Sequence, residues 1–546
     1  MSVRIRSPRP RAVPIALIAA VLGLLGATAL AQPAVARANT LTVATNGDDD
    51  NPGTLSAPLR TLQHAVDLAA PGTVIQIRGG VYAPEANVQI NKDGEPGDPI
   101  TMTAYRGEHV VIDGENMPYT PGELDGSIPR PDRGALHVEG DWWVFRDLEI
   151  IHGPYGIFCM NCNDNVFDRL VTRDNYESGL HLFLESGGNL IRNLDSYGNF
   201  DPRNNGESAD GLAIKEGSGE GNVVRGARLW NNVDDGFDSW EFTSPILIED
   251  SVAWGNGFDR WGFPDFQGDG NGFKLGRGAD TATHTVRDSI AFGNAQHGII
   301  DNGNPASMLI EHNTAWDNAE TGFVFDRSTS TLNGNLSVGN ATAVSLGSSG
   351  GSGNSWDVKD DWSDADLIST DTAAITGPRR PDGSIPATDF LRPQGHSDLG
   401  ADFSDNDDDD DDGGGATEPG RYEAEGASAD CDGTIDADHA GFSGSGFCNT
   451  DNRTGAFAQF TVDAPESGTA TLEIRFANGG GDGRPAQVSV NGAEAGSIPF
   501  DATDGWTDWS TATVTVSLDA GGDTVRLVAT GSGGLPNIDY LEVAAD

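Results

Sequence analysis

Four copies of one tetrapeptide decide the fold: Ser196-Tyr197-Gly198-Asn199, Ala253-Trp254-Gly255-Asn256, Ala291-Phe292-Gly293-Asn294 and Ala315-Trp316-Asp317-Asn318. Looser copies end at Asn175, Asn232 and Asn340. A second mark, a glycine followed by a short apolar run, recurs at Gly179, Gly211, Gly236, Gly272, Gly298 and Gly322. From each of these glycines to the next of the asparagines, the chain is 18 to 22 residues long.

A unit of nearly constant length, built from short β-rich runs, is typical of one coil of a parallel β-helix. Asparagines that recur at one corner of such coils stack into a hydrogen-bonded ladder. Leucine-rich repeats have a similar period, but their Leu-x-x-Leu-x-Leu framework is missing from this sequence. We therefore expect an all-β fold based on a right-handed parallel β-helix.

Two turns of the repeat are expanded. The step from Asn to the following Gly is 4 residues in most copies, but 12 between Asn199 and Gly211 and 16 between Asn256 and Gly272. Both expansions leave the same corner, on the coils that flank the segment Asp234 to Asp238. Loops on a rigid scaffold commonly carry function, so we expect these two to form the walls of a groove.

The composition of the chain predicts four parts. Residues 1–36 have an arginine-rich start, a short apolar core and small-residue cleavage sites, which predict an export signal. Residues 37–395 form the β-helix, and a helix at Thr61 to Ala70 caps its open first coil. Residues 396–420 contain an Asp run and several glycines and predict a linker. Residues 421–546 alternate apolar and polar residues between turn signals, which predicts a β-sandwich of the jelly-roll type.

The charge and the cysteines limit the class of protein. The formal net charge is -50, and nucleic acid is excluded as a partner because phosphate binding needs clustered Lys and Arg. No segment after the export signal is apolar enough to span a bilayer, so we expect a secreted, soluble monomer.

The cysteines form two local pairs, Cys159 with Cys162 and Cys431 with Cys448, which predict disulfides in an exported protein. A zinc site at the first pair is the alternative.

Alignment of the coils on their glycines brings charged residues together. The position before the glycine holds Ser178, Asp210, Asp235, Asn271 and His297 in successive coils. The second position after the glycine holds His181, Ala213, Asp238, Lys274 and Ile300 in the same order. Successive coils are about 4.8 Å apart, so Asp210 and Asp235 should be neighbours, with Asp234 and Asp238 nearby. Carboxylates this close need a counter-cation. Calcium, which takes about six to eight oxygen ligands, fits them; an ordinary Asp-Asp-Gly turn is the alternative.

Lysine is scarce and occurs only at Lys92, Lys215, Lys274 and Lys359. Arginine is always protonated, whereas lysine can be tuned to act as a base. Lys274, at the position of Asp238 in the next coil, is therefore a candidate base. Lys215 does not share that position and is a candidate substrate contact. A salt bridge to the aspartates is the alternative role of Lys274. A calcium ion and a neutral amine together suit β-elimination in a uronate polymer. Calcium acidifies the C5 proton of a bound uronate, the amine removes that proton, and the C4 glycosidic oxygen leaves. Such an enzyme should become more active toward alkaline pH.

The chain resembles polysaccharide lyase family nine, the pectate lyases, from Leu41 to about Gly350. The resemblance is carried by Asp210-Gly211, Asp234-Asp235-Gly236-Phe237-Asp238, Asn271-Gly272-Phe273-Lys274-Leu275-Gly276 and Gly79-Gly80-Val81-Tyr82-Ala83-Pro84. It implies that Asp210, Asp234, Asp235 and Asp238 bind the catalytic Ca²⁺, that Lys274 is the base, and that the substrate is polygalacturonate or pectin.

Two other functions remain open at this point. A polygalacturonase-type hydrolase has similar segments at Ser208-Ala209-Asp210-Gly211, Asp234-Asp235 and His297-Gly298, but hydrolysis by two carboxylates has no need of Lys274. A non-catalytic β-helix adhesin would bind a glycan and release no product.

The C-terminal part resembles carbohydrate-binding module family thirty-five. The resemblance is carried by Tyr422-Glu423-Ala424-Glu425, His439-Ala440-Gly441-Phe442-Ser443-Gly444 and Asn537-Ile538-Asp539-Tyr540-Leu541. It implies a structural Ca²⁺ held by Glu423, Glu425 and Asp539, and we expect Arg484, Trp506 and Asn537 to contact sugar. Such a module would tether the enzyme to plant cell-wall or uronic-acid glycans.

Overall fold

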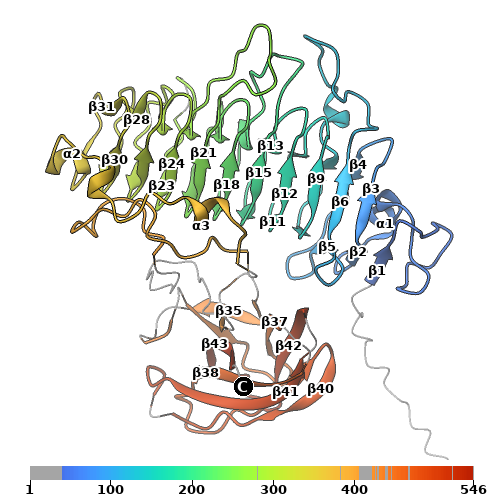
Figure 1. Ribbon diagram of the computed structural model, residues 1–546. Coiled ribbons are helices and arrows are strands. Elements are labelled where there is room, and N and C mark those ends of the chain that lie inside the picture. Colours follow the sequence, from blue (N-terminus) through green and yellow to red (C-terminus); the bar gives the residue numbers. More distant parts are fainter. Residues whose placement is uncertain are drawn as a thin grey trace, which may run out of the picture. The chain divides into compact units, whose positions relative to one another are not determined.

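The computed structural model describes residues 40–278, 281–380, 383–404, 421–424, 426, 429–436, 439, 441–443, 446–464, 468–503, 505–518 and 521–544. The predicted export signal, residues 1–36, lies outside the described residues, as do residues 405–420 of the predicted linker. Figure 1 shows the two folded parts, which are described one at a time. None of the helices in the described ranges has the length and hydropathy of a membrane span.

Within residues 40–404, apart from the short gaps at 279–280 and 381–382, three long parallel sheets form a right-handed β-helix (Figure 1). The first sheet contains β1 (Thr40–Val43), β2 (Val74–Ile77), β5 (Ile100–Ala104), β8 (Trp143–Arg146), β11 (Val166–Asp168), β14 (Leu190–Arg192), β17 (Asn222–Arg225), β20 (Ile246–Glu249), β23 (Thr285–Arg287), β26 (Leu309–Glu311), β29 (Thr331–Asn333) and β32 (Gly350–Ser352). The predicted fold class is confirmed.

The second sheet, called the site sheet below, contains β4 (Val88–Ile90), β7 (Leu136–Val138), β10 (Ile157–Met160), β13 (Leu180–Glu185), β16 (Leu212–Ser218), β19 (Phe237–Asp238), β22 (Phe273–Lys274), β25 (Ile299–Ile300), β28 (Thr321–Phe325) and β31 (Thr342–Leu346). The third sheet contains β3 (Gly80–Tyr82), β6 (Val110–Asp113), β9 (Glu149–Ile151), β12 (Val171–Arg173), β15 (Asp195–Tyr197), β18 (Arg228–Trp230), β21 (Val252–Trp254), β24 (Ile290–Phe292), β27 (Thr314–Trp316) and β30 (Leu336–Val338).

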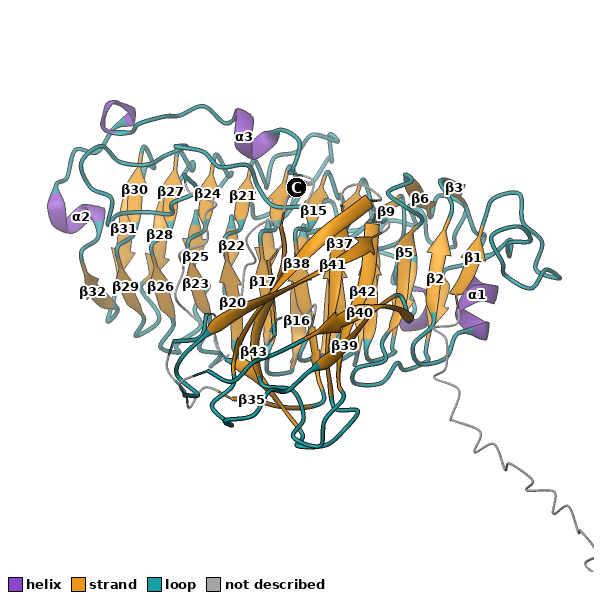
Figure 2. Ribbon diagram, turned by 90° about the horizontal axis from the view of Figure 1, so that it is seen from below, coloured by secondary structure: helices purple, strands orange, loops and turns teal. Residues whose placement is uncertain are grey.

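Apolar side chains of all three sheets point inward and form one continuous core. Trp143 and Phe145 of β8 stack with ring centroids 5.5 Å apart, and Phe145 stacks on Phe167 of β11, in the next coil, at 5.3 Å. The first coil is covered by α1 (Leu62–Leu68), which contacts β1 and β4 and buries Leu62 and Val66. Figure 2 shows this helix at the β1 end of the stack, where a cap was predicted. It removes the open end of the core from water.

The repeated tetrapeptide forms the corner between the third sheet and the site sheet. Its third position takes a left-handed backbone, for example φ 66° at Gly198 and 52° at Asp317. Only Gly, Asn and Asp tolerate this region readily, which explains the residue types found there. The tetrapeptide is therefore a turn signal as well as a strand signal.

The asparagine that ends the tetrapeptide forms the predicted ladder. Asn175, Asn199, Asn232, Asn256, Asn294, Asn318 and Asn340 are linked in this order by side-chain hydrogen bonds. Each donates Nδ2 to the Oδ1 of the next at 2.9 to 3.1 Å. The amides also satisfy backbone groups of the corner, so the ladder holds the coils in register.

Replacing Asn256 with alanine is expected to lower the free energy of unfolding by about 1–3 kcal/mol. The change leaves the backbone and side-chain donors of Asn232 buried without their acceptor. Urea denaturation measures the effect. Asn340→Ala, at the half-buried end of the ladder, should cost less because water can replace the lost acceptor. Equal effects of the two changes would contradict the role given to the buried ladder.

The chain after the last coil folds back along the third sheet. This segment contains α2 (Ser355–Val358), a short 3₁₀ helix (Asp364–Asp366) and α3 (Ala373–Thr376), and Figure 1 shows α3 beside the strands. An outward-facing stack of rings takes one ring from each of five coils: Tyr197, Trp230, Trp254, Phe292 and Trp316. The returning segment packs against the last three of these rings.

Ion pairs fix this segment to the sheet. The buried Asp195 pairs with Arg228 of β18 and with Arg379 of the returning chain, at 2.6 and 2.7 Å. Arg228 also donates to the carbonyl oxygens of Ile375 and Gly377 at 2.9 and 2.7 Å. The chain that follows the last coil therefore covers part of one face of the β-helix.

The C-terminal part, residues 421–544 with the gaps given above, has two antiparallel sheets. One contains β33 (Arg421–Glu423), β35 (Gly433–Asp436), β36 (Phe447–Thr450), β38 (Gly468–Ala477), β41 (Ser510–Leu518) and β43 (Asn537–Ala544). The other contains β34 (Ala429–Cys431), β37 (Phe457–Ala464), β39 (Ala486–Val490), β40 (Ala493–Ile498) and β42 (Gly521–Ala529). They enclose an apolar core, which confirms the predicted β-sandwich.

Both local cysteine pairs are disulfides, Cys159 with Cys162 and Cys431 with Cys448. The alternative of a zinc site at the first pair is thereby excluded.

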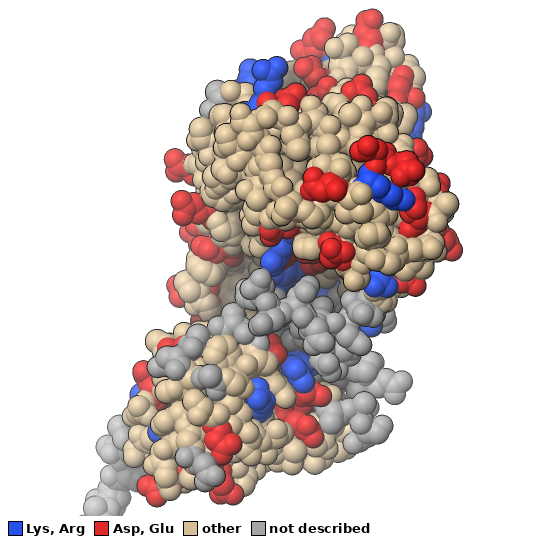
Figure 3. Space-filling view, turned by 90° about the vertical axis from the view of Figure 1, so that its left-hand side faces the viewer, with Lys and Arg blue, Asp and Glu red and all other residues tan. Residues whose placement is uncertain are grey.

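The end view in Figure 3 shows acidic side chains spread over the surface with few basic ones among them, in agreement with the net charge of -50.

Candidate active site

The register of the site sheet brings the predicted site residues onto neighbouring strands. Ala213 of β16 pairs with Asp238 of β19, and Asp238 pairs with Lys274 of β22. The backbone carbonyl oxygens of Asp235 and Asn271 accept hydrogen bonds from the glycines of the preceding coils. The alignment of the coils on their glycines is therefore correct.

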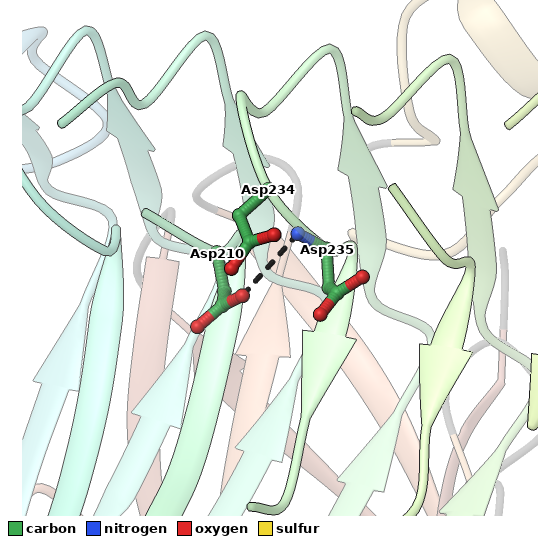
Figure 4. Close-up of side chains that lie close together, drawn as sticks. All are labelled: Asp210, Asp234 and Asp235. Carbon is green, nitrogen blue, oxygen red and sulfur yellow. Dashed lines mark hydrogen bonds between the residues drawn. The ribbon is translucent and has the colours of Figure 1, made fainter. Parts of the chain in front are cut away.

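Three of the four predicted calcium ligands form one buried cluster. Asp210, Asp234 and Asp235 each place a carboxylate oxygen within 4.8 Å of the other two, and Figure 4 shows the three side chains close together on neighbouring coils. Asp210 precedes β16, and the other two precede β19. Backbone amides hold them in place: Asp235 donates to Asp210 at 3.3 Å, and Asp269 donates to Asp234 at 2.6 Å.

Asp238 and the two lysines form the other side of the cluster. Lys215 Nζ lies 2.7 Å from Asp210 Oδ2 and 2.8 Å from Asp238 Oδ2. Lys274 Nζ lies 2.9 Å from Asp235 Oδ2 and 3.6 Å from Asp238 Oδ2. Asp238 thus faces two ammonium groups and stands outside the group of three, and Lys215 contacts the carboxylates rather than open solvent. The salt bridges that were the alternative role of Lys274 are present.

Burial and mutual repulsion set the protonation of these groups. Burial raises the pKa of Asp210 to about 7, raises that of Asp234 well above its ordinary value, and raises that of Asp235. Burial also opposes ionisation of Asp238, but Lys215 and Lys274 outweigh it and hold the pKa of Asp238 below its ordinary value. The carboxylates ionise reluctantly because more negative charge is gathered than two lysines neutralise.

The oxygen-rich cluster fits a calcium ion. Hard divalent cations prefer carboxylate oxygens, and Asp210, Asp234 and Asp235 supply three from buried, backbone-fixed positions. Burial first, and then the neighbouring carboxylates, raise the pKa of these carboxyls, and a divalent cation would favour their ionised form. Asp210 and Asp235 each face one lysine and Asp238 faces both, so a cation would compete with the ammonium groups for these oxygens.

Beside the cluster opens a cavity of about 720 Å³ with three walls; Asp234, Asp238, Lys215 and Lys274 line it, and Asp210 and Asp235 lie buried behind them. As predicted, the two expanded turns line the cavity, the first with Arg203, Asn204, Glu207 and Ser208 and the second with Gln267 and Asp269. The third wall, from residues 114–135 between β6 and β7, was missed; it contributes Asp125 to Ile128 and Arg133. Its expansion lies upstream of the first recognisable Gly and Asn marks, so the repeat carries no signal for it. Arg203 donates to the carbonyl oxygen of Gly126 at 3.0 Å and links two of the walls.

In the C-terminal β-sandwich, the structure brings together some of the predicted sugar-contact residues and some of the predicted ligands of the structural calcium. The Arg484 guanidinium lies 5.0 Å from the centre of the Trp506 ring, and Asn537 begins β43 nearby in the same domain and is buried. Glu423 and Asp539 are linked through Ser443, whose hydroxyl donates to Glu423 at 2.8 Å and whose amide donates to Asp539 at 3.0 Å. Asp539 also pairs with Arg475. Glu425 lies outside the described residues.

Both folded parts of the chain resemble known proteins. Residues 41–335 match the family model described as "Pel9A-like, right handed beta helix region", and residues 423–545 match "Carbohydrate binding module (family 6)". Pectate lyase PEL9 of Emericella nidulans is 48% identical over 392 residues, which cover 68% of this chain and 95% of that protein. The crystal structure of pectate lyase Pel9A superposes with a TM-score of 0.58 at 30% identity, covering 66% of this chain and 90% of that one.

The module has relatives of its own. Endo-1,4-beta-xylanase B of Cellvibrio japonicus is 46% identical over 123 residues, 22% of this chain and 20% of that enzyme. The shared part is therefore the module alone, which confirms a carbohydrate-binding module. With its β-helix matched over more than half of the chain, the protein belongs to the Pel9A-like family of pectate lyases and is a polysaccharide lyase that carries a carbohydrate-binding module.

Proposed function

We propose that this protein cleaves polygalacturonate by calcium-dependent β-elimination, with Lys274 as the base. The observation that supports the proposal most is a group of three buried carboxylates with a lysine amine against it, at a cavity that both Asp234 and Lys274 line. Asp210, Asp234 and Asp235 are assigned as calcium ligands. The family resemblance adds Asp238 to this set. A hydrolase would use two carboxylates without a lysine among them.

The residues of the chain divide the work. When bound, calcium polarises the uronate carboxylate and acidifies the neighbouring C5 proton. Lys274 takes that proton, the C5–H electron pair forms the C4=C5 double bond, and the C4–O bond breaks as the leaving oxygen takes a proton from water. The walls of the cavity hold the polymer across the site sheet, so that one sugar faces Lys274.

The charge of the site controls the base. Burial lowers the pKa of Lys274, but Asp235, Asp238, Asp234 and Asp269 together outweigh burial and raise it well above its ordinary value. The amine acts only when neutral. Neutralising the carboxylates with a divalent cation removes the interactions that favour the ammonium form, so metal binding and base strength are linked.

The proposed reaction is tested by measuring its unsaturated product. Polygalacturonate is incubated with the protein in the presence of calcium or of a chelator, and ultraviolet absorbance reports the unsaturated sugar end. We expect absorbance that rises with calcium and stops with chelator. Reducing ends without absorbance would indicate hydrolysis, and binding without product would indicate an adhesin.

We propose further that the protein is exported and acts as a monomer outside the cell. The composition of residues 1–36 and the two disulfides support this location. N-terminal sequencing of protein from the culture medium tests it, and a mature chain that still begins at Met1 would contradict it.

For the module, we propose binding of plant cell-wall or uronic-acid glycans through Arg484, Trp506 and Asn537, with a structural calcium at Glu423, Glu425 and Asp539. Trp506→Ala is expected to weaken binding to insoluble pectic polymer about tenfold, since a stacked ring and its partner contribute on the order of 1 kcal/mol. Pull-down with the polymer measures this. Activity on soluble polygalacturonate is the control and should not change; unaltered binding would remove Trp506 from the sugar site.

A further inference from the structure

The cavity extends beyond the carboxylate cluster toward the N-terminal coils. There it is lined by Ile128, Arg133, Tyr155 and His181, none of which has a role in calcium binding or proton abstraction. Ile128 and Arg133 come from the third wall, and His181 lies on β13 of the site sheet. This end of the cavity is called the distal end below.

The floor of the distal end is formed by Ile128, Tyr155 and His181, which line the cavity, and the buried rings of Phe158 and Phe183 support it from behind. Ile128, Tyr155, Phe158 and Phe183 pack against one another and exclude water. The imidazole of His181 completes the floor, with ring centroids 5.5 Å from Tyr155, 5.1 Å from Phe158 and 5.8 Å from Phe183. Aromatic surfaces of this kind take the C–H faces of sugar rings as well as cations.

Arg133 is a cation fixed on this floor without a carboxylate partner. Its guanidinium carbon lies 5.3 Å from the ring of Phe158, and 5.8 and 5.7 Å from those of Tyr155 and Phe183. Its Nε donates to the carbonyl oxygen of Ile128 at 3.3 Å. No ion pair of Arg133 with Asp or Glu occurs among the described residues, although the chain carries 83 acidic residues. The remaining guanidinium donors suit a planar carboxylate supplied by a ligand.

His181 gives an independent sign of a ligand. The side chain is 5% exposed, and neither ring nitrogen has a hydrogen-bond partner among the described residues. Burial first, and then Lys215 and Arg133, lower the pKa of His181, so the imidazole stays neutral. Buried polar groups are normally satisfied, and a sugar hydroxyl is a partner that a neutral imidazole can either donate to or accept from.

The distal end lies on the same line as the catalytic residues. His181, Ala213, Asp238 and Lys274 are register partners on successive strands of the site sheet, and strands are about 4.8 Å apart. A polymer that presents one sugar to Lys274 and runs along this line passes over the aromatic floor. The two ends of the cavity therefore belong to one binding groove.

We propose that Arg133 and the aromatic floor form a second uronate-binding subsite, which holds the carboxylate of another galacturonate unit of the polymer bound at Lys274. The inference rests on the proposed function and extends it from the reacting sugar to substrate selection. Free carboxylates are recognised there, and methyl esters are not, because an ester offers Arg133 no charge.

The experiment compares Arg133→Gln with wild type on polygalacturonate and on highly methyl-esterified pectin. On polygalacturonate, the KM should rise about tenfold with kcat little changed, as for loss of one charge-assisted hydrogen bond. On the esterified substrate, the same variant should lose little. Arg133→Lys keeps the charge and should recover most of the affinity. Arg133→Met, whose apolar stem still packs on the rings, replaces the glutamine variant if that one fails to fold.

The matched control is Arg106→Gln, which removes an exposed arginine that also lies over an aromatic ring but lines no part of this cavity. It should behave as wild type. A wild-type KM for the Arg133 variants, or an equal loss on both substrates, would overturn the subsite. Absence of calcium-dependent unsaturated product from the wild-type protein would instead overturn the proposed function, so the two failures are distinguishable.

Discussion

Lys274→Ala is expected to lower kcat on polygalacturonate by a factor of about 10²–10⁴, the usual contribution of a positioned general base. The nearest second amine, Lys215, is held between Asp210 and Asp238 and is not free to replace it. Calcium binding should persist, because the carboxylates of the cluster remain. Initial rates of absorbance increase, together with calorimetric calcium titration, measure both quantities.

The control that separates the two roles of this lysine is Lys274→Arg. Arginine keeps the positive charge that pairs with Asp235 and Asp269, but it does not give up its proton near neutral pH. If Lys274 is the base, the arginine variant is as inactive as the alanine variant. If Lys274 only neutralises the aspartates, the arginine variant keeps most of its activity, and the assignment of the base is wrong.

The pH dependence follows from the same group. The surrounding carboxylates raise the pKa of Lys274 despite its burial, and the ammonium form cannot accept the C5 proton. The kcat of the wild-type protein should therefore rise as the pH rises toward that pKa. The residual activity of the alanine variant should lack this rise, which a pH profile of both proteins shows.

Asp234→Asn is expected to weaken calcium binding about 10–100-fold, as for the loss of one charged interaction. The asparagine keeps an oxygen to accept the hydrogen bond from the Asp269 amide, so the local backbone should be preserved. Activity should return when calcium is raised in proportion to the weaker affinity. Calcium titrations followed by heat and by initial rate measure the change.

Asp317→Asn serves as the matched control. It removes the same charge from an exposed corner with a left-handed backbone that asparagine also tolerates. Calcium affinity and activity should stay at the wild-type level. A calcium affinity of Asp234→Asn equal to that of this control would remove Asp234 from the metal site.

The arrangement of the site was predictable because coil length is nearly constant. Once Gly211, Gly236 and Gly272 are aligned, an offset in sequence becomes a position in space, and this places Asp235 and Lys274 on neighbouring coils. The left-handed corner and the asparagine ladder enforce that alignment physically. The β-sandwich was predictable for a similar reason, since alternation reports which face of a strand is buried.

Contacts between distant segments were not predictable. The returning chain after the last coil is fixed by Arg379 on Asp195, 184 residues away, and no local pattern encodes such a pair. The third wall of the cavity precedes the recognisable repeat, so Arg133 carried no positional signal. The pairing of Asp238 with two lysines also depends on side-chain directions that spacing alone leaves open.

The most direct measurement is a crystal structure with calcium and an oligogalacturonate, grown at a pH where Lys274 is protonated and turnover is slow. The account predicts one ion held by oxygens of Asp210, Asp234 and Asp235, a uronate carboxylate on that ion, and Lys274 Nζ about 3–3.5 Å from C5 of the same sugar. An ion bound elsewhere, or a Lys274 amine that faces a different sugar, would contradict it.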